Sequence, residues 1–214
     1  QAYFTLFPKS DERQTVNSLD INSDPTAIIK QNEAIFYEWN ELYNDYKFGI
    51  IADVTTNNII YSPPDIAFPI IGLDKDLEAY LEFTYNIDTN EEIINLANSL
   101  AEGETSQYEV VFNIADWTKD NIKYDLNTLT AAAVQKSSWV YVNREGVCDE
   151  ITSLFISLLR SVGIPARFVS GMVYSNVDNG FGNHGWAEVY FPDYGWVPFD
   201  VTFGEYGWIN PSHI

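Results

Sequence analysis

The chain has 214 residues, 46% of them hydrophobic and 15% aromatic, and a formal net charge of −20. Nucleic acid binding is disfavoured because phosphate contacts need clustered Lys and Arg, and no apolar run approaches the roughly 20 residues that cross a bilayer. The acidic residues are spread over both halves without an EF-hand pattern, so we interpret the charge as a solvated surface and expect no metal or other cofactor.

The amino-terminal part predicts β structure. Residues 34–39 and 46–52 are apolar and aromatic runs around a polar turn, and residues 81–85 form a third such run. The composition changes near residues 86–92. We therefore predict a β-rich segment at 1–90 and a separate core at 91–214. Residues 1–7 lack the basic region and the apolar stretch of a signal peptide.

Three helices are predicted in the core. The pattern becomes helical at Glu91, and a longer helix follows over residues 108–122. A third begins at Cys148 and ends at Gly163 and Pro165. Its apolar residues fall at the spacing of one buried stripe: Ile151, Leu154, Phe155, Leu158, Leu159 and Val162.

Cys148 is the single cysteine of the chain, at the start of that third helix. Helix-start amides carry partial positive charge that favours a thiolate, so Cys148 is a candidate nucleophile, although a lone cysteine is often only a small buried hydrophobe. Asp149 and Glu150 place negative charge beside the sulfur. We expect both carboxylates to be solvated and to point away, so that an ion pair with a histidine dominates.

A cysteine nucleophile needs a base, and the chain has two histidines. His213 is the penultimate residue, where chains usually fray, which leaves His184. Residues 184–191 alternate as in a strand, and a turn at 192–195 leads to a second extended run at 196–200. In such a hairpin His184 and Asp200 fall at the same end, where Asp200 can orient the imidazole.

Four segments carry a resemblance to a known family. Arg144-Glu145-Gly146-Val147-Cys148-Asp149-Glu150 and residues 158–167 resemble the nucleophile loop and helix exit of the transglutaminase-like superfamily of cysteine enzymes. Residues 184–190 and 195–202 resemble its histidine and aspartate strands, although Val201 stands where a proline is common. The resemblance covers residues 105–203, and residues 1–90 weakly resemble the β-rich leader of some microbial members.

The resemblance implies an α+β, papain-like core, with the nucleophile at a helix start packed on an antiparallel sheet. It also implies acyl transfer through a thioester, on a glutamine carboxamide or a peptide bond of a protein or peptide substrate. An amine acceptor would give crosslinking, and water would give peptidase or amidase activity. A non-catalytic surface interaction domain and an inert structural cysteine are the alternatives.

The remaining parts of the site are less defined. One oxyanion donor should be the amide of Cys148, and the second an indole, for which we choose Trp139 over Trp117 and Trp186. A metal at Cys148, His184 and Asp200 is disfavoured, because one cysteine and one usable histidine make a poor zinc set. The aromatic, acidic composition and the leader suggest an extracellular or cell-surface microbial protein, with a cytoplasmic location as the alternative.

Overall fold

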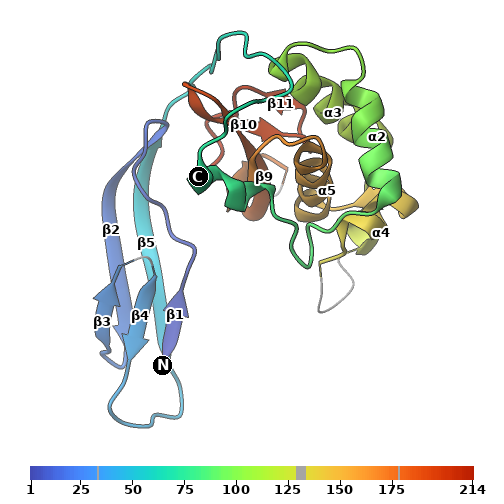
Figure 1. The fold of residues 1–214 in the computed structure, drawn as a ribbon. Helices are drawn as coiled ribbons and strands as arrows, with labels where there is room; N and C mark the ends of the chain where they lie inside the picture. The colour runs from blue at the N-terminus through green and yellow to red at the C-terminus, as the bar shows by residue number, and fades with distance from the viewer. Residues whose placement is uncertain (33, 129–133, 178) are drawn as a thin grey trace.

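The computed structural model describes residues 1–32, 34–128, 134–177 and 179–214. It consists of a long β arm, formed by the first five strands, and a mixed helix and sheet body (Figure 1). No helix in the described part of the chain is long and apolar enough to span a membrane.

The arm is built on a long antiparallel pair, β2 (Gln14–Asp24) with β5 (Lys47–Thr56). A three-stranded sheet with the order β1-β4-β3 lies beside this pair, and its strands are β1 (Ala2–Phe4), β3 (Ile28–Gln31) and β4 (Ile35–Glu38). Aromatic rings join the two parts, with Tyr37 in contact with Phe4, Trp39 and Phe48. The arm is thus held by a small aromatic cluster of its own.

Of the three strands predicted for this part, two are present and one is not. Those expected at 34–39 and 46–52 are β4 and β5, which pair with other strands and not with each other. The strand expected at 81–85 is absent. A short helix, α1 (Lys75–Glu78), and a 3₁₀ turn, η1 (Ala79–Leu81), lead into irregular backbone there. Only the first residue of this run belongs to η1, which contacts α5 and β8, whereas residues 82–85 are exposed.

The helices of the body surround one central helix. The predicted first two are present as α2 (Glu91–Ala101) and α3 (Gln107–Asn121), and α4 (Ser137–Asn143) precedes the central α5 (Cys148–Ser161). Small elements connect them: β6 (Lys123–Tyr124), η2 (Leu126–Thr128) and β7 (Glu145–Gly146). Residues 150–159 of α5 are all buried, so this helix is enclosed on every side and not only along the predicted stripe.

The other wall of the body is a four-stranded antiparallel sheet with the order β11-β10-β9-β8. Its strands are β8 (Ala166–Ser175), β9 (Gly180–Phe191), β10 (Gly195–Asp200) and β11 (Glu205–Tyr206). Ala187, Val189 and Phe191 of β9 are fully buried in the core cluster that includes α5. The fold is therefore the α+β type with a helix start packed at an antiparallel sheet.

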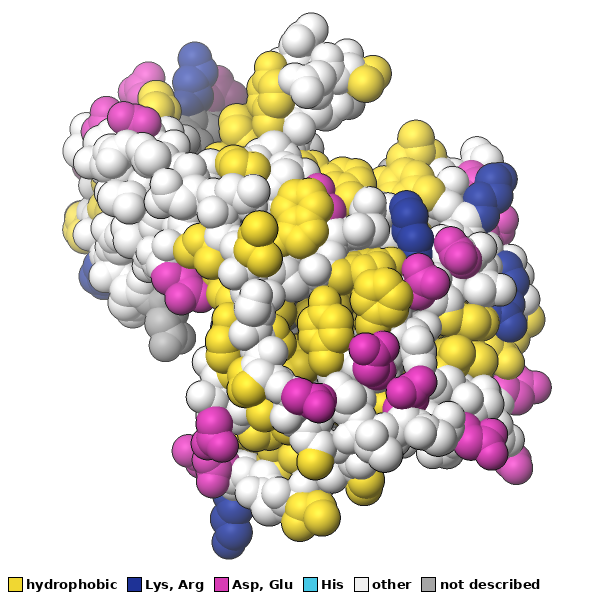
Figure 2. All heavy atoms as spheres, turned by 90° about the horizontal axis from the view of Figure 1, so that it is seen from above, with side chains coloured by type: hydrophobic (Ala, Val, Ile, Leu, Met, Phe, Trp, Pro, Cys, Tyr) yellow, Lys and Arg dark blue, Asp and Glu magenta, His cyan; other side chains and the backbone are white. Residues whose placement is uncertain are grey.

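The surface carries its acidic residues in scattered positions. In the view of Figure 2, Asp and Glu side chains are distributed among apolar and polar atoms and do not gather in one patch. This face agrees with the interpretation of the charge as a solvated surface. The boundary predicted at residue 90 stays a prediction.

Candidate active site

Cys148 is the first residue of α5 and is partly exposed. The backbone just before it is fixed by Glu150, whose carboxylate accepts from the amide of Val147 at 3.0 Å and from that of Gln135 at 2.9 Å. Glu150 is only 2% exposed. The expectation that this carboxylate is solvated and points away is wrong, because two backbone amides in the loop need an acceptor.

Asp149 is half-buried beside the thiol. Burial raises the pKa of its carboxyl, and the negative charge of Glu150 raises it further. This carboxyl group is therefore not fully solvated either, and its burial disfavours a negative charge beside the sulfur.

His184 and Asp200 meet at one end of the hairpin formed by β9 and β10. Nε2 of His184 lies 2.7 Å from Oδ2 of Asp200, and both side chains are almost fully buried. The register pairs Gly195 with Phe191, which leaves a three-residue turn and brings the start of one strand beside the end of the other. The hydrogen bond proposed from the hairpin pattern is thus present.

The two groups shift each other's protonation. Burial lowers the pKa of His184, but hydrogen bonds to Asp200 and Cys148 outweigh this effect and raise it to about 9. Burial raises the pKa of Asp200, but hydrogen bonds from His184 and His213 lower it to about 2. The site therefore favours an imidazolium beside a carboxylate over a wide pH range.

The thiol of Cys148 is close enough to His184 for a hydrogen bond between the two side chains. Because Nε2 of His184 is engaged with Asp200, Nδ1 is the nitrogen that can take the thiol proton. The structure thus brings the side chains of Cys148, His184 and Asp200 together in that order, with His184 between the other two.

His213 is a residue that the sequence interpretation misplaced. It was expected at a frayed end, yet its side chain is fully buried and its Nε2 lies 3.0 Å from Oδ2 of Asp200. The carboxyl end of the chain is held by β8, because the amide of Met172 donates to the carbonyl of Ile214 and the amide of Ile214 donates back, both at 2.9 Å. Edge pairing with a strand distant in sequence produces no local sequence signal.

The side chains of His184, Asp200 and His213 are also arranged as three possible ligands of a metal ion. One donor atom each from His184, Asp200 and His213 lies within 4.8 Å of the others. The contacts of 2.7 and 3.0 Å fit hydrogen bonds between imidazole N–H groups and a carboxylate, so each donor already has a partner in this network.

The indole candidates for the second oxyanion donor lie in different surroundings. Trp139 is on α4 and packs against the hydrophobic core. Trp117 holds the guanidinium of Arg144 over its ring, at 4.7 Å from the centroid. Trp186 lies 6.2 Å from the His184 ring, and its Nε1 is a buried donor without a protein partner among the described residues. The choice of Trp139 stays a prediction, and Trp186 is the candidate indole that stacks on the His184 ring.

Two further side chains of the site went unnoticed in the sequence. Tyr124 is on β6, and Gly146 of β7 is its partner two residues before Cys148. Burial raises the pKa of Tyr124, and the nearby Cys148 and Asp149 raise it further, so its hydroxyl remains a donor. Phe203 stacks on the His184 ring at 4.8 Å between centroids. Phe203 follows Asp200 by only three residues, and this short spacing is the sequence signal that could have identified it. Tyr124 is distant in sequence and reaches the site through the pairing of β6 with β7.

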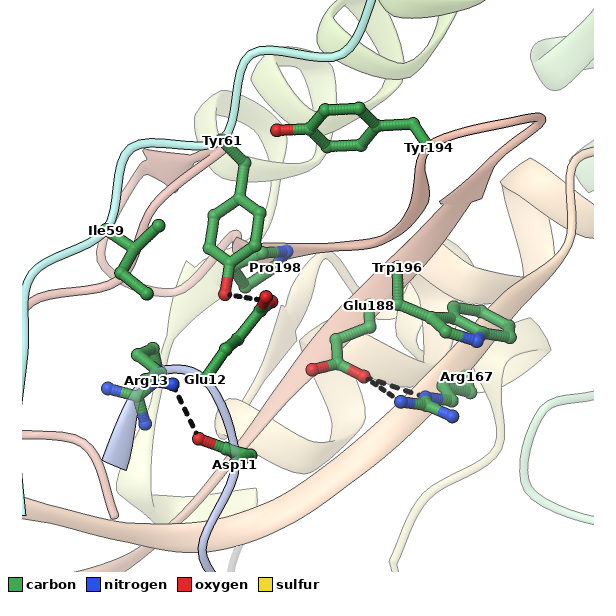
Figure 3. A pocket seen from close by; sticks show the side chains of 10 residues that line it. All are labelled: Asp11, Glu12, Arg13, Ile59, Tyr61, Arg167, Glu188, Tyr194, Trp196 and Pro198. Carbon is green, nitrogen blue, oxygen red and sulfur yellow. Dashed lines mark hydrogen bonds and ion pairs between the residues drawn. The ribbon is translucent and has the colours of Figure 1, made fainter. Parts of the chain in front are cut away.

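A cavity of about 680 Å³ lies farther along the sheet (Figure 3). Its wall is made by the segment before β2, the linker after β5 and the sheet, with the lining residues Asp11, Glu12, Arg13, Ile59, Tyr61, Arg167, Glu188, Tyr194, Trp196 and Pro198. Glu188 follows His184 by four residues on β9, so the two side chains share a sheet face roughly 13 Å apart. The cavity is a neighbour of the site, since Cys148, His184 and Asp200 are not among its lining residues.

Charges inside this cavity are mostly paired. The guanidinium of Arg167 contacts the carboxylate of Glu188 at 2.6 Å and lies 4.3 Å from the centre of the Trp196 ring. The hydroxyl of Tyr61 donates to Glu12 at 2.8 Å, as Figure 3 shows. The cavity therefore offers aromatic faces and the outer oxygens of carboxylates to anything that enters it.

Comparison with known proteins agrees with this geometry. Residues 94–201, about half of the chain, match the model of the transglutaminase-like superfamily. The uncharacterised protein YebA of Bacillus subtilis is 30% identical over 140 residues, which are 58% of this chain and 19% of YebA. An uncharacterised protein of Haemophilus influenzae is 29% identical over an alignment that covers 90% of this chain and 61% of that protein.

A solved structure supports the same fold. A candidate cysteine protease from Cytophaga hutchinsonii superimposes with a TM-score of 0.72 at 20% identity, over 99% of this chain and 75% of that one. The chain spans less than two thirds of the length of the two curated relatives, and its arm and body are both covered by the solved structure. On the family match and this fold, the chain belongs to the transglutaminase-like superfamily.

Proposed function

We propose that this chain is a cysteine-dependent acyl-transfer enzyme in which Cys148 is the nucleophile, His184 the base and Asp200 the orienting residue. The observation that carries the proposal is the buried bond of 2.7 Å between His184 and Asp200, made beside a lone thiol at a helix start. An inert structural cysteine would have no need of an oriented imidazole against it.

The proposed reaction has two halves. The proton of the thiol is held on Nδ1 of His184 in a thiolate–imidazolium pair, and the sulfur attacks the carbonyl carbon of a carboxamide or peptide bond. The imidazolium then gives the proton to the departing nitrogen, so that ammonia or an amine leaves and a thioester remains on Cys148. Water or a primary amine attacks the thioester carbonyl, and His184 takes the proton of this second nucleophile. The C–S bond then breaks, the acid or substituted amide leaves, and the thiolate–imidazolium pair is restored.

The acceptor of the acyl group decides between hydrolysis and transfer. Cys148 is partly exposed, so water reaches the sulfur side of the site in this conformation. This exposure supports hydrolysis as one outcome. The resemblance implies that the superfamily contains both hydrolases and acyltransferases. We propose a protein or peptide substrate, because the neighbouring cavity presents aromatic rings and carboxylates at a spacing of a few extended residues from His184.

Alkylation of the single cysteine tests the nucleophile without knowledge of the substrate. We expect iodoacetamide at neutral pH to label the folded protein faster than the urea-unfolded protein, and His184→Ala to lose this excess while remaining folded. Labelling that is slow in the folded protein and becomes fast only after unfolding would contradict the proposal. Because the chain has one cysteine, the mass increase reports Cys148 alone.

A second assay separates the two acceptors. The protein would be incubated with a glutamine-containing peptide, with and without a primary amine, while released ammonia and peptide mass are followed. Transfer predicts a peptide–amine adduct, whereas hydrolysis predicts glutamate or cleaved peptide even when amine is present. Cys148→Ser serves as the matched inactive control.

A further inference from the structure

The carboxylate of Asp200 accepts four hydrogen bonds. Oδ1 takes the amides of Thr202 and Phe203, at 2.9 and 3.0 Å, and Oδ2 takes Nε2 of His184 and Nε2 of His213. An ionised carboxylate can only accept, so each histidine must carry its proton on Nε2. The orienting group of the proposed triad is therefore shared between two imidazoles.

The second imidazole is held from several sides. Nδ1 of His213 lies 3.1 Å from the carbonyl oxygen of Asn210, to which it can donate only when the ring carries a proton on both nitrogens. The backbone of His213 forms an antiparallel bridge with Val173 of β8. Gly171, opposite His184 on β8, has no side chain, and a Cβ there would lie 2.5 Å from both the Trp186 ring and the carbonyl oxygen of Ile214. The carboxyl-terminal segment thus occupies space that a side chain at position 171 would otherwise fill.

The amino-terminal arm also fixes this segment. Nη2 of Arg13 donates to the carbonyl oxygen of His213 at 3.0 Å, and the hydroxyl of Thr56 donates to that of Pro211 at 2.6 Å. Arg13 is 6% exposed. A penultimate residue that is buried, bridged to a strand and anchored from the other end of the chain has a defined position, which suits it to place another group.

We propose that His213 is a positioning residue of the triad: its Nε2–H bond to Oδ2 fixes the carboxylate of Asp200 and takes up part of the negative charge that holds the proton of His184. This inference rests on the proposed function, since it gives a role to the carboxylate only if His184 is the base. His213 contacts neither the thiol nor, by this assignment, the substrate.

The proposal has a definite electrostatic sign. The titratable groups that face His184 are Asp200, Cys148 and, at 5.4 Å between ring centroids, His213. Asp200 and His184 face the ring of His213, and the guanidinium of Arg13 bonds its backbone carbonyl. A second donor on Oδ2 weakens the hold of this oxygen on the His184 proton. Loss of that donor should therefore raise the pH at which His184 gives up its proton and leave the carboxylate free to turn.

Two amides make a matched pair of variants. In His213→Gln the side-chain amide nitrogen can occupy the place of Nε2 and donate to Asp200. In His213→Asn the amide nitrogen takes the place of Nδ1, near Asn210, and cannot reach the carboxylate. Both variants are neutral, polar and capable of the same backbone bridge, so they differ mainly in the contact with Asp200.

The readout is nuclear magnetic resonance of protein labelled with ¹⁵N-histidine, which is simple to assign because the chain has two histidines. We expect wild-type protein to show a proton on Nε2 of both rings. We expect His213→Asn to raise the titration midpoint of His184 by about one pH unit, and His213→Gln to remain near wild type.

Several results would overturn the assignment. One is a His213 ring without a proton on Nε2 in the wild-type protein, which needs no variant and decides the question even if His213→Asn does not fold. A second is a folded His213→Asn protein with an unchanged midpoint and tautomer of His184. A third is a stoichiometric divalent cation whose removal by EDTA changes both histidine spectra.

Failure of the proposed function would look different. If wild-type Cys148 is sluggish toward iodoacetamide while the Nε2 protons and the shift of His184 are as expected, the two-histidine network stands and the catalytic role falls. Ser212→Ala, which keeps the backbone of the segment and removes a hydroxyl bonded to Asn210, controls for general loosening of the chain end.

Discussion

Oδ2 of Asp200, the last residue of β10, lies 2.7 Å from Nε2 of His184, which precedes the part of β9 that pairs with β10. This relationship selects the imidazole nitrogen that faces Cys148 and keeps an anion next to the ring in a buried place. The reactivity of the thiol, the pH dependence of the fold and the tolerance of the hairpin to substitution all depend on it.

Asp200→Asn should reduce the rate of thiol-dependent turnover by a factor on the order of 10² to 10⁴. Its amide oxygen would accept from Thr202 and Phe203, which turns the NH₂ group toward the histidines and forces Nε2 of His184 to accept. Nδ1 would then carry the proton and could not take one from Cys148. Rates of alkylation and turnover, measured against pH, check this expectation.

Asp193→Asn is the matched control for that variant. Asp193 lies exposed in the turn between the two strands, so the same chemical change there should leave both rates near wild type. Equal losses in the two variants would show that the hairpin, and not the tautomer of His184, is affected.

Stability should fall at both ends of the pH range. The folded-state pKa of His184 is raised from 6.5 to about 9, so its contribution is complete below the unfolded value and is lost as pH rises through about 9. The pKa of Asp200 is lowered from 3.8 to about 2, so its contribution is present above 3.8 and is lost as pH falls through about 2. Urea midpoints measured from about pH 2 to about pH 10 test both limits.

The two limits can be assigned to their residues. His184→Gln should flatten the alkaline decline while the variant keeps the acidic one in weakened form. An alkaline decline of the same size in this variant would mean that other groups cause it.

Gly185→Ala should destabilise the body by about 1–3 kcal/mol, because a Cβ at this position would overlap the ring of Phe168 and a packed core resists extra volume. Gly182→Ala, three residues earlier on β9, adds its Cβ into open space and should change stability little. Urea unfolding of both variants gives the comparison. If the two glycines tolerate alanine equally well, Phe168 does not pack against Gly185 as described.

Glu150→Ala should cost about 1–3 kcal/mol, because the buried amide of Val147 and the partly buried amide of Gln135 would lose their acceptor. The loop that presents Cys148 would loosen, so alkylation of the thiol should also change. Glu150→Gln keeps one acceptor oxygen and should lie between wild type and Glu150→Ala in unfolding free energy. A Glu150→Ala protein as stable as wild type would show that water satisfies these amides.

Parts of the fold with a short-range pattern could be predicted from the sequence. Helices α2, α3 and α5 follow the 3.6-residue apolar period, and the hairpin of β9 and β10 follows strict alternation around a turn. Those same elements carry Cys148, His184 and Asp200, so the sequence alone could predict that these three side chains lie close together. The sequence did not reveal that β4 pairs with β1 and β3 and not with β5, because strand partners depend on contacts between distant segments.

The sequence by itself determined a lone cysteine at a helix start, a histidine and an aspartate at one end of a hairpin, and the superfamily to which these segments belong. Only the tertiary structure decided that Glu150 is buried under the nucleophile loop, that Tyr124 lies beside Cys148 and that His213 shares the carboxylate of Asp200. Local periodicity is set by neighbouring residues, whereas these contacts join segments that come together only when the whole chain packs.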